Sequence, residues 1–226
     1  MYIFLVAYRA RGNQSFRRQQ IDLLIKNIEI YFNKNNVDYK IMICEQNDDE
    51  KFNRGKLLNI AFLESERIFD FPKKYFHMNA DYLFDLSRRF PNQIAEFKTG
   101  VMDLYGLNYL PILGAACVFD PESYRTINGF PNDLLGWGGD DWAIYNRLKR
   151  KSIPIFYPQH LHNSGFIIEC NDDKKVLDES NNGTNMELAK RDDINTNGLS
   201  SCVYVVHSNG EFHNEKNIYH YLIDLQ

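Results

Sequence analysis

Long apolar runs, paired cysteines and an excess of basic residues are all missing from this chain of 226 residues. The apolar segment at residues 2–7 is far too short to span a bilayer, and it lacks the charged lead and cleavage site of a signal peptide. The four cysteines are scattered, which argues against a disulfide framework or a structural zinc site. The net charge of −4 gives no reason to expect nucleic acid or an anionic membrane as a partner. Together these absences predict a soluble protein of a reducing compartment.

Internal repeats and linkers are also missing, so residues 1–226 are expected to form one domain. Apolar runs alternate with a helical pattern, and the expected elements are strands at residues 2–8, 37–45 and 73–78 and a helix at residues 15–33. This order predicts an α/β fold with a mostly parallel central sheet flanked by helices. The polar segment 171–197 has little periodicity and is expected to be a surface loop, the kind of segment that often forms a lid.

Charged and polar residues follow two of the predicted strands. Tyr8, Arg9 and Arg11 lie at the end of the first strand, and Asn79-Ala80-Asp81 follows the third. Open α/β sheets bind ligands at the carboxyl ends of their strands, so the arginines suit an anion and Asp81 suits an oxygen-binding metal. A solvated basic turn and an ordinary turn-forming aspartate are the alternatives.

Two further segments begin helices in a way that suits a ligand. At one predicted helix start, Arg54 and Lys56 suit a phosphate group. The other is Gly136-Trp137-Gly138-Gly139-Asp140-Asp141, where glycines permit close approach of a ligand and the helix dipole favours ionised carboxylates. An ionised carboxylate beside an indole suits the deprotonation of a sugar hydroxyl. The alternative is a glycine loop in which Asp140 or Asp141 is only an N-cap.

Three long motifs make the sequence resemble the β-1,4-galactosyltransferase family. In chain order they are Phe52-Asn53-Arg54-Gly55-Lys56-Leu57-Leu58-Asn59, Thr126-Ile127-Asn128-Gly129-Phe130-Pro131-Asn132, and Gly136-Trp137-Gly138-Gly139-Asp140-Asp141 with Asn146-Arg147-Leu148. The resemblance extends from Tyr8 to about Ser201, and three motifs in order are far more specific than a single short one. The family implies a GT-A fold, a UDP-sugar donor, a manganese ion and inversion at the sugar carbon.

The resemblance also implies roles for individual residues. Asp141 matches the family's catalytic base. Asp140 stands where the family has Glu, and it would hold the acceptor sugar together with Trp137 and Gly139. The residues implied around the donor and its nucleotide are Tyr8, Arg9, Arg11, Phe52, Arg54, Asn79, Ala80, Asp81, Trp137 and Gly138.

The metal site departs from the family pattern. The family's Asp-Val-Asp motif corresponds to Asn79-Ala80-Asp81 if one residue is inserted after His77, so Asp81 alone is kept. The family's Met and His ligands fall on Ile167, which cannot bind a metal, and on Cys170, whose thiolate would favour softer metals. A weakened metal site is therefore expected, held by Asp81 with Cys170 or with another residue.

The donor pocket departs as well. Ile112 stands where galactose-specific members have a Tyr that faces the donor's C2 substituent. A smaller side chain leaves room for an N-acetyl group, so the chain resembles the N-acetylgalactosaminyl-transferring branch more closely. A shift of one residue in the alignment would make Ile112 an ordinary core residue.

The expected function is an inverting glycosyltransferase that moves GalNAc, or failing that Gal, from a UDP-sugar to a glycan hydroxyl. Asp141 would be the base, and Mn²⁺ would aid the departure of UDP. One alternative is a catalytically degenerate sugar- or nucleotide-binding module, which the eroded metal motif favours, and another is a galactosyl- or glucosyltransferase on the same fold. Without a membrane anchor, the enzyme is expected to be cytoplasmic and of bacterial or viral origin.

Overall fold

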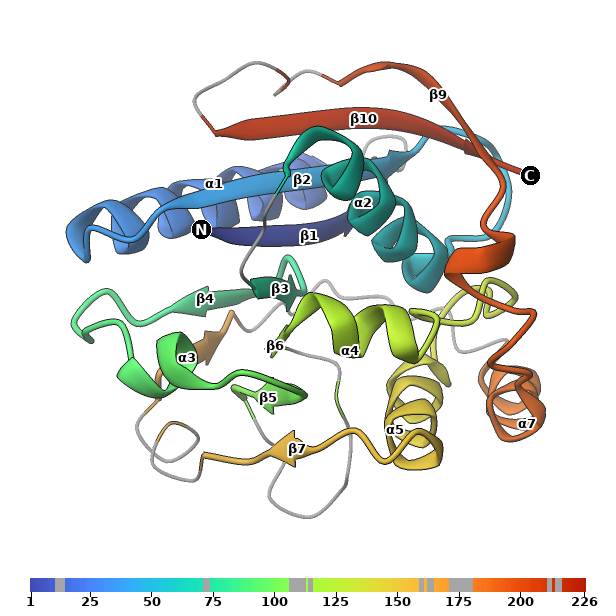
Figure 1. Ribbon diagram of the computed structural model, residues 1–226. Helices are drawn as coiled ribbons and strands as arrows, with labels where there is room; N and C mark the ends of the chain where they lie inside the picture. The colour runs from blue at the N-terminus through green and yellow to red at the C-terminus, as the bar shows by residue number, and fades with distance from the viewer. Residues whose placement is uncertain are drawn as a thin grey trace.

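A mixed β-sheet of eight strands forms the centre of the fold, in the order β7-β5-β6-β3-β1-β2-β10-β9 (Figure 1). A computed structural model describes residues 1–10, 15–70, 74–105, 113, 116–158, 161, 165–170, 181–210, 213 and 217–226. Within these ranges the sheet consists of β1 (Tyr2–Tyr8), β2 (Tyr39–Gln46), β3 (Lys74–Met78), β5 (Val101–Asp103), β6 (Ala116–Phe119), β7 (Ile155–Phe156), β9 (Tyr204–Asn209) and β10 (Ile218–Leu225).

Most of the strands run in one direction. β1 is parallel to β2 and β3, β10 is parallel to β2, and β5 is parallel to β7. β6 is antiparallel to both β3 and β5, and β9 is antiparallel to β10. The predicted mostly parallel α/β sheet is therefore confirmed, and the carboxyl ends of β1, β2, β3, β5 and β7 share one edge, where ligands bind in such sheets.

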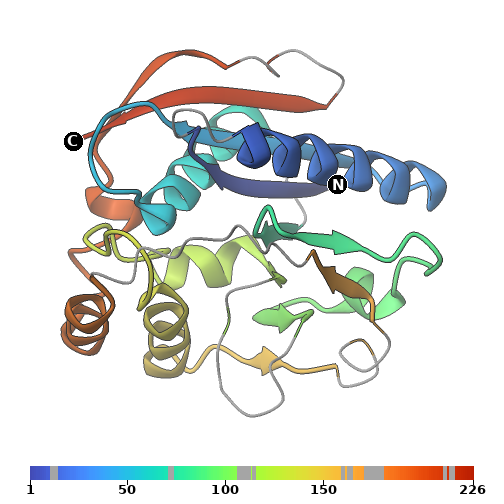
Figure 2. The ribbon, with the colours of Figure 1, turned by 180° about the vertical axis from the view of Figure 1, so that it is seen from behind.

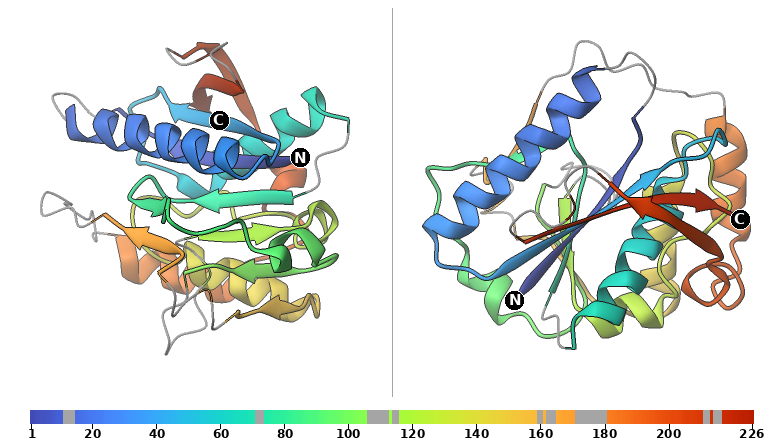
Figure 3. Two further views of the ribbon diagram at one scale, coloured as in Figure 1. Left: turned by 90° about the vertical axis from the view of Figure 1, so that its left-hand side faces the viewer. Right: turned by 90° about the horizontal axis from the view of Figure 1, so that it is seen from above.

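Helices cover both faces of the sheet (Figures 2 and 3). One face carries α1 (Ser15–Lys34), α3 (Asn92–Glu96) and a small antiparallel sheet of β4 (Tyr82–Phe84) and β8 (Ile167–Glu169). The other face carries α2 (Arg54–Ile68), α4 (Pro121–Thr126) and α5 (Asp140–Arg150). Figure 3 shows α1 and α2 on opposite sides of the central strands.

The central strand β1 shows why both faces need cover. Phe4 and Val6 belong to the core under α1, whereas Ile3 and Leu5 belong to the core under α2. All four side chains are buried. Alternate residues of a strand point to opposite faces, so a strand that is apolar throughout must be covered on both.

One expectation about the C-terminal third was wrong. Residues Asn182–Arg191, within the segment expected to be a loop, form helix α7. Its buried face holds Asn185 and Ala189, so no apolar stripe reveals the helix in the sequence. Residues 171–180 lie outside the described part of the chain. In the described ranges, none of the helices has the length and apolar character needed to cross a membrane.

Candidate active site

The site is centred on a guanidinium between two carboxylates. Nη1 of Arg54, the first residue of α2, lies 2.6 Å from Oδ2 of Asp140 and 3.6 Å from Oδ1 of Asp141, both in the first turn of α5. Nε of Arg54 donates a hydrogen bond of 2.9 Å to Oδ1 of Asn79, just past β3. Four residues that the sequence had singled out in three separate segments therefore meet at one point.

Two contacts hold Arg54 in this position: the N-cap of its own helix and the ring of Phe130. Asn53 caps α2 by accepting a hydrogen bond of 2.9 Å from the backbone N–H of Lys56. The guanidinium carbon of Arg54 lies 5.6 Å from the centre of the Phe130 ring, a cation–π distance. Burial alone would lower the pKa of Arg54, but the charges of Asp140 and Asp141 raise it. Arg54 therefore stays charged.

The Asp141 side chain is accessible from solvent, and the pKa of its carboxyl is raised. Its side chain is 39% exposed, so an oxygen can reach a bound hydroxyl. Burial raises the pKa of this carboxyl, and the charges of Asp140 and of Asp103 at the end of β5 raise it further. The charge of Arg54 lowers it. A carboxylate with a raised pKa is a better proton acceptor near neutral pH.

The glycines before α5 are required by close contacts. Gly138 and Gly139 have φ angles of +100° and +86°. A Cβ atom on Gly139 would lie 2.8 Å from the backbone oxygen of Asn185 in α7, and the positive φ angles would strain any other residue at both positions. Trp137 lies in this glycine loop, three residues before Asp140, and is 41% exposed. An exposed indole is a suitable surface for a sugar ring.

Asn185 of α7 holds this glycine loop, and sequence reasoning missed it. Its side chain is buried, and its amide donates to the carbonyls of Leu135 and Gly138 at 2.9 and 3.0 Å. A third carbonyl, that of Trp137, lies 3.4 Å away. The partners are backbone oxygens nearly 50 residues away, so no sequence motif marks the contact.

A buried ion pair anchors the other end of α5. Nε and Nη2 of Arg147 each lie 2.6 Å from an oxygen of Asp192, and both side chains are almost fully buried. Nη1 of Arg147 also donates to the carbonyls of Asn128 and Gly129 at 3.0 and 2.8 Å. The bidentate geometry fixes α5 against the turn before Phe130 and against the segment after α7.

The predicted metal residues form a second acidic group at the same edge of the sheet. The backbone N–H of Cys170 donates to the Asp81 carbonyl at 2.8 Å, and the β4–β8 pairing places Tyr82 opposite Glu169. Ile167 lies buried in β8. Burial raises the pKa of the Cys170 thiol, and the charges of Asp81 and Glu169 raise it further. A metal would therefore have to displace the thiol proton in order to bind there.

In the described part of the chain, Asp81 is the side chain that suits a metal ion at this corner of the sheet. Among the described residues, no group of three His, Cys, Asp or Glu side chains converges on one point. Asp81 is buried at the end of β3. Hard divalent cations of the Mg²⁺ type are commonly held by one or two carboxylates together with phosphate oxygens of the substrate, so Asp81 fits such an ion when a diphosphate is present.

Tyr8, Arg9 and Phe52, also predicted to surround the sugar donor, are each held in a different way. Tyr8 is buried at the end of β1. Arg9 donates to the carbonyls of Asp48, at 2.8 Å, and Glu50, and so holds the loop after β2. The carbonyl of Phe52 accepts a hydrogen bond of 2.8 Å from Gly136, which places it against the glycine loop.

One further expectation is wrong, and two others concern residues outside the described part of the chain. Lys56 is buried and its ammonium group donates to the Gln226 carbonyl, so it does not join Arg54 in a phosphate site as expected. Ala80, between Asn79 and Asp81, is half-buried. Arg11 and Ile112 lie outside the described residues.

Two protein families and a curated relative match most of this chain. Residues 3–84 match the family described as the N-terminal region of glycosyl transferase group 7, and residues 91–169 match the one described as the N-terminal domain of galactosyltransferase. Mouse beta-1,4-galactosyltransferase 1 is 32% identical over 180 residues, which are 75% of this chain and 43% of that protein. The chain thus spans less than half the length of this curated relative.

Two solved structures share the fold. The catalytic domain of Drosophila beta-1,4-galactosyltransferase 7 with xylobiose superposes with a TM-score of 0.72 at 17% identity, covering 100% of this chain and 95% of that one. A variant of the same Drosophila protein, in complex with manganese, UDP-Gal and xylobiose, has a TM-score of 0.72, 16% identity and the same coverage. These relatives are animal proteins and give no support to the expected bacterial or viral origin.

Proposed function

Since the chain belongs to glycosyltransferase group 7, the family of the β-1,4-galactosyltransferases, and has the GT-A fold, we propose that it moves a sugar from a UDP-sugar to a hydroxyl of a glycan acceptor with inversion. The observation that carries this proposal is the accessible Asp141 carboxylate, 3.6 Å from the partly buried guanidinium of Arg54, at a helix start that follows a loop with the exposed Trp137. Residues 1–226 act as one catalytic domain in this proposal.

The proposed chemistry is a single displacement. Asp141 accepts the proton of the acceptor hydroxyl while that oxygen forms a bond to the anomeric carbon of the donor. The bond from this carbon to the diphosphate oxygen breaks on the opposite face, and UDP leaves with the electron pair. Arg54 pairs with Asp140 and supplies positive charge close to the reacting atoms, where a low-dielectric site makes such charge most effective.

The acceptor and donor occupy different sides of the glycine loop in this proposal. Trp137, Gly139 and Asp140 hold the acceptor sugar, because an indole face and a carboxylate complement the two surfaces of a sugar ring. The donor and its nucleotide lie against Gly138 and the residues at the strand ends, namely Tyr8, Arg9, Arg11, Phe52, Arg54, Asn79, Ala80 and Asp81. The part of segment 171–197 that is described, α7, contacts the glycine loop through Asn185, which supports a role for this segment in shaping the acceptor side.

Manganese is the proposed cofactor, with Asp81 as its protein ligand. When bound, such an ion neutralises charge on the diphosphate and makes UDP a better leaving group. Cys170 is adjacent to Asp81, but its soft sulfur contributes little to the binding of a hard cation. The reduced donor set predicts that manganese binds weakly to the free protein and more tightly together with UDP.

The donor sugar has two candidates. Ile112 supports UDP-GalNAc by the steric argument given above, and this preference rests on that residue alone. The name of the mouse relative supports UDP-Gal. Both candidates place a UDP-sugar in the same site, so they change the substrate but not the reaction.

A donor panel tests the proposal. Hydrolysis and transfer are measured with UDP-GalNAc, UDP-Gal, UDP-GlcNAc and UDP-Glc, each with Mn²⁺ and with EDTA, against a mixture of neutral oligosaccharide acceptors. We expect manganese-dependent turnover that is highest with UDP-GalNAc. Preference for UDP-Gal would keep the transferase and contradict the role of Ile112. Absence of both turnover and UDP binding with every donor would instead favour a degenerate binding module.

A further inference from the structure

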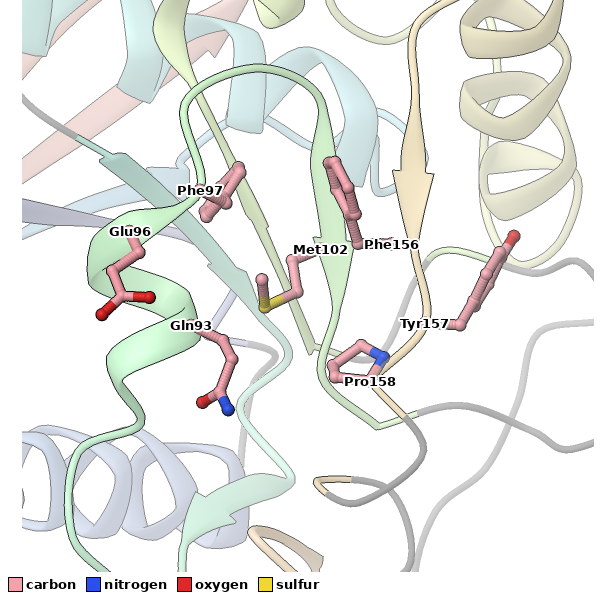
Figure 4. A pocket seen from close by; sticks show the side chains of 7 residues that line it. All are labelled: Gln93, Glu96, Phe97, Met102, Phe156, Tyr157 and Pro158. Atoms are coloured by element: carbon pink, nitrogen blue, oxygen red, sulfur yellow. The ribbon is translucent and has the colours of Figure 1, made fainter.

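A shallow groove lies between α3, β5 and β7, outside the site described above. Its volume is about 390 Å³, and its lining includes Gln93, Glu96, Phe97, Met102, Phe156 and Pro158 (Figure 4). This volume falls within the range of small-molecule sites, which are mostly apolar with a few polar groups. None of these residues has a part in the proposed chemistry.

Two phenyl rings form the walls of the groove. The ring centres of Phe97 and Phe156 lie 6.2 Å apart at an angle of 58°, and the buried Met102 lies between them as the floor (Figure 4). The ammonium group of Lys74 lies 4.1 Å from the Phe97 ring centre and donates to the Phe97 carbonyl, which fixes that wall. Phe156 remains 42% exposed. Exposed aromatic surface beside a fixed aromatic wall is typical of a binding site.

The rim of the groove is polar. Gln93 and Glu96 are three residues apart on α3 and so share one side of the helix, and Figure 4 shows both side chains at the groove. Across the described part of the chain, neither side chain has a recorded hydrogen bond or ion pair. An amide and a carboxylate offer both donors and acceptors to hydroxyl groups. A sugar ring has apolar C–H faces and a hydroxyl rim, and this groove complements both.

The groove lies beside the edge of the sheet that carries the catalytic carboxylates. Met102 directly precedes Asp103 at the carboxyl end of β5, and Phe156 is the last residue of β7, which is parallel to β5. Tyr157 and Pro158 continue the lining of the groove past the end of β7, with the Tyr157 ring turned away from Phe156 (Figure 4). Asn79 follows β3 at the same edge and accepts a hydrogen bond from Arg54, which contacts both Asp140 and Asp141.

We propose that the groove between α3, β5 and β7 binds a hexose unit of the acceptor glycan that lies beyond the reacting sugar. This inference rests on the proposed transfer to a glycan. It predicts that the enzyme distinguishes acceptors by length, because a monosaccharide bound at Trp137 has no second sugar unit to place in the groove, whose lining does not include Trp137. An apolar aglycone is a poorer occupant, because it would leave Gln93 and Glu96 facing a surface without hydrogen-bonding groups.

The test observes the groove directly. The chain has five methionines, so labelling their methyl groups with ¹³C gives a simple NMR spectrum in which Met102→Leu identifies the Met102 signal. The probes are chitotetraose, maltotetraose and cellotetraose, with the corresponding monosaccharides and octyl glucoside below its micelle concentration. We expect at least one tetrasaccharide to shift the Met102 signal saturably. Phe156→Ala and Glu96→Ala should each weaken this binding about tenfold, equivalent to about 1.4 kcal/mol.

Controls separate this inference from the proposed function. Leu23→Ala removes an exposed apolar side chain from α1 and should leave the tetrasaccharide shift unchanged. Phe156→Ala should also raise KM for the tetrasaccharide about tenfold, with kcat and the KM for a monosaccharide unchanged. Turnover of the donor panel without any Met102 shift would overturn the groove and keep the transferase. A shift by octyl glucoside but by no tetrasaccharide would overturn the sugar occupant.

Discussion

Two acidic corners occupy the same edge of the sheet, and they are supported very differently. The charges of the catalytic corner, defined by Asp140 and Asp141, are balanced by the partly buried guanidinium of Arg54, and the corner is held by hydrogen bonds from Arg54 and Asn185. The metal corner, defined by Asp81 and Cys170, is held by the three-residue β4–β8 ladder and a backbone hydrogen bond. The first corner has its geometry before any ligand arrives, whereas the second needs one.

The difference follows from the charge that each corner must carry during the reaction. A general base has to be in position when the acceptor hydroxyl arrives, so its supporting contacts belong to the protein. A divalent cation brings its own charge and can complete its ligand shell with phosphate oxygens and water. We therefore expect substitutions at the catalytic corner to act on turnover and substitutions at the metal corner to act on cofactor dependence.

The largest expected effect is that of Asp141→Asn. The amide cannot accept the acceptor proton, so kcat should fall by about a thousandfold, within the usual contribution of a general base. UDP binding, measured by calorimetry, should remain at the wild-type level. Loss of UDP binding together with turnover would contradict the role of Asp141 and indicate a structural one.

The second largest expected effect concerns the stability of the protein around α5, the helix that begins with Asp140 and Asp141. Arg147→Met leaves the buried Asp192 carboxylate without its partner, so the free energy of unfolding should fall by about 3–5 kcal/mol. Urea denaturation measures the change. Arg191→Met, at an exposed end of α7, is the matched control and should change stability little. The double variant Arg147→Met/Asp192→Leu should recover part of the loss, and failure to recover any would assign the effect to packing.

The metal corner is tested by a pair of substitutions. Asp81→Asn should weaken Mn²⁺ binding in the presence of UDP, followed by electron paramagnetic resonance of the free ion, and lower turnover by about a hundredfold, or about 2.7 kcal/mol. Cys170→Ser should leave both close to wild type, because a soft sulfur adds little to the binding of a hard cation. An equal loss in Cys170→Ser would show that the thiol binds the metal and would make the two corners more alike.

Asn185→Ala should have a smaller effect at the catalytic corner. The change removes hydrogen bonds to the carbonyls of Leu135 and Gly138, each worth about 1 kcal/mol, and lets the glycine loop move. We expect kcat to fall about tenfold with little change in donor KM. Thr184→Ala, next to it on α7, is the control. A fall in stability with unchanged kcat would limit Asn185 to a structural role.

The sequence indicated the parts of the site that lie in continuous segments. Arg54, Asp140 and Asp141 each sit at a helix start, where a cap, glycines and the dipole leave a local pattern. Asn185 and the Arg147–Asp192 pair left no such pattern, because their partners lie some 45 to 50 residues away. The same cause hid α7, whose buried face is partly polar because it binds backbone carbonyls.

The smallest expected effect is a shift in pH dependence. Asp141 must be ionised to act, so kcat/KM should fall as pH falls through its pKa, and the raised pKa places this limb above the value of about 4 for an ordinary aspartate. Asp103→Asn removes one of the charges that raise this pKa, so the limb should move to lower pH. Glu122→Gln, an exposed acid on α4, should leave the limb in place. A shift to higher pH in Asp103→Asn would mean that another group sets the limb, because removing a neighbouring negative charge can only ease the ionisation of Asp141.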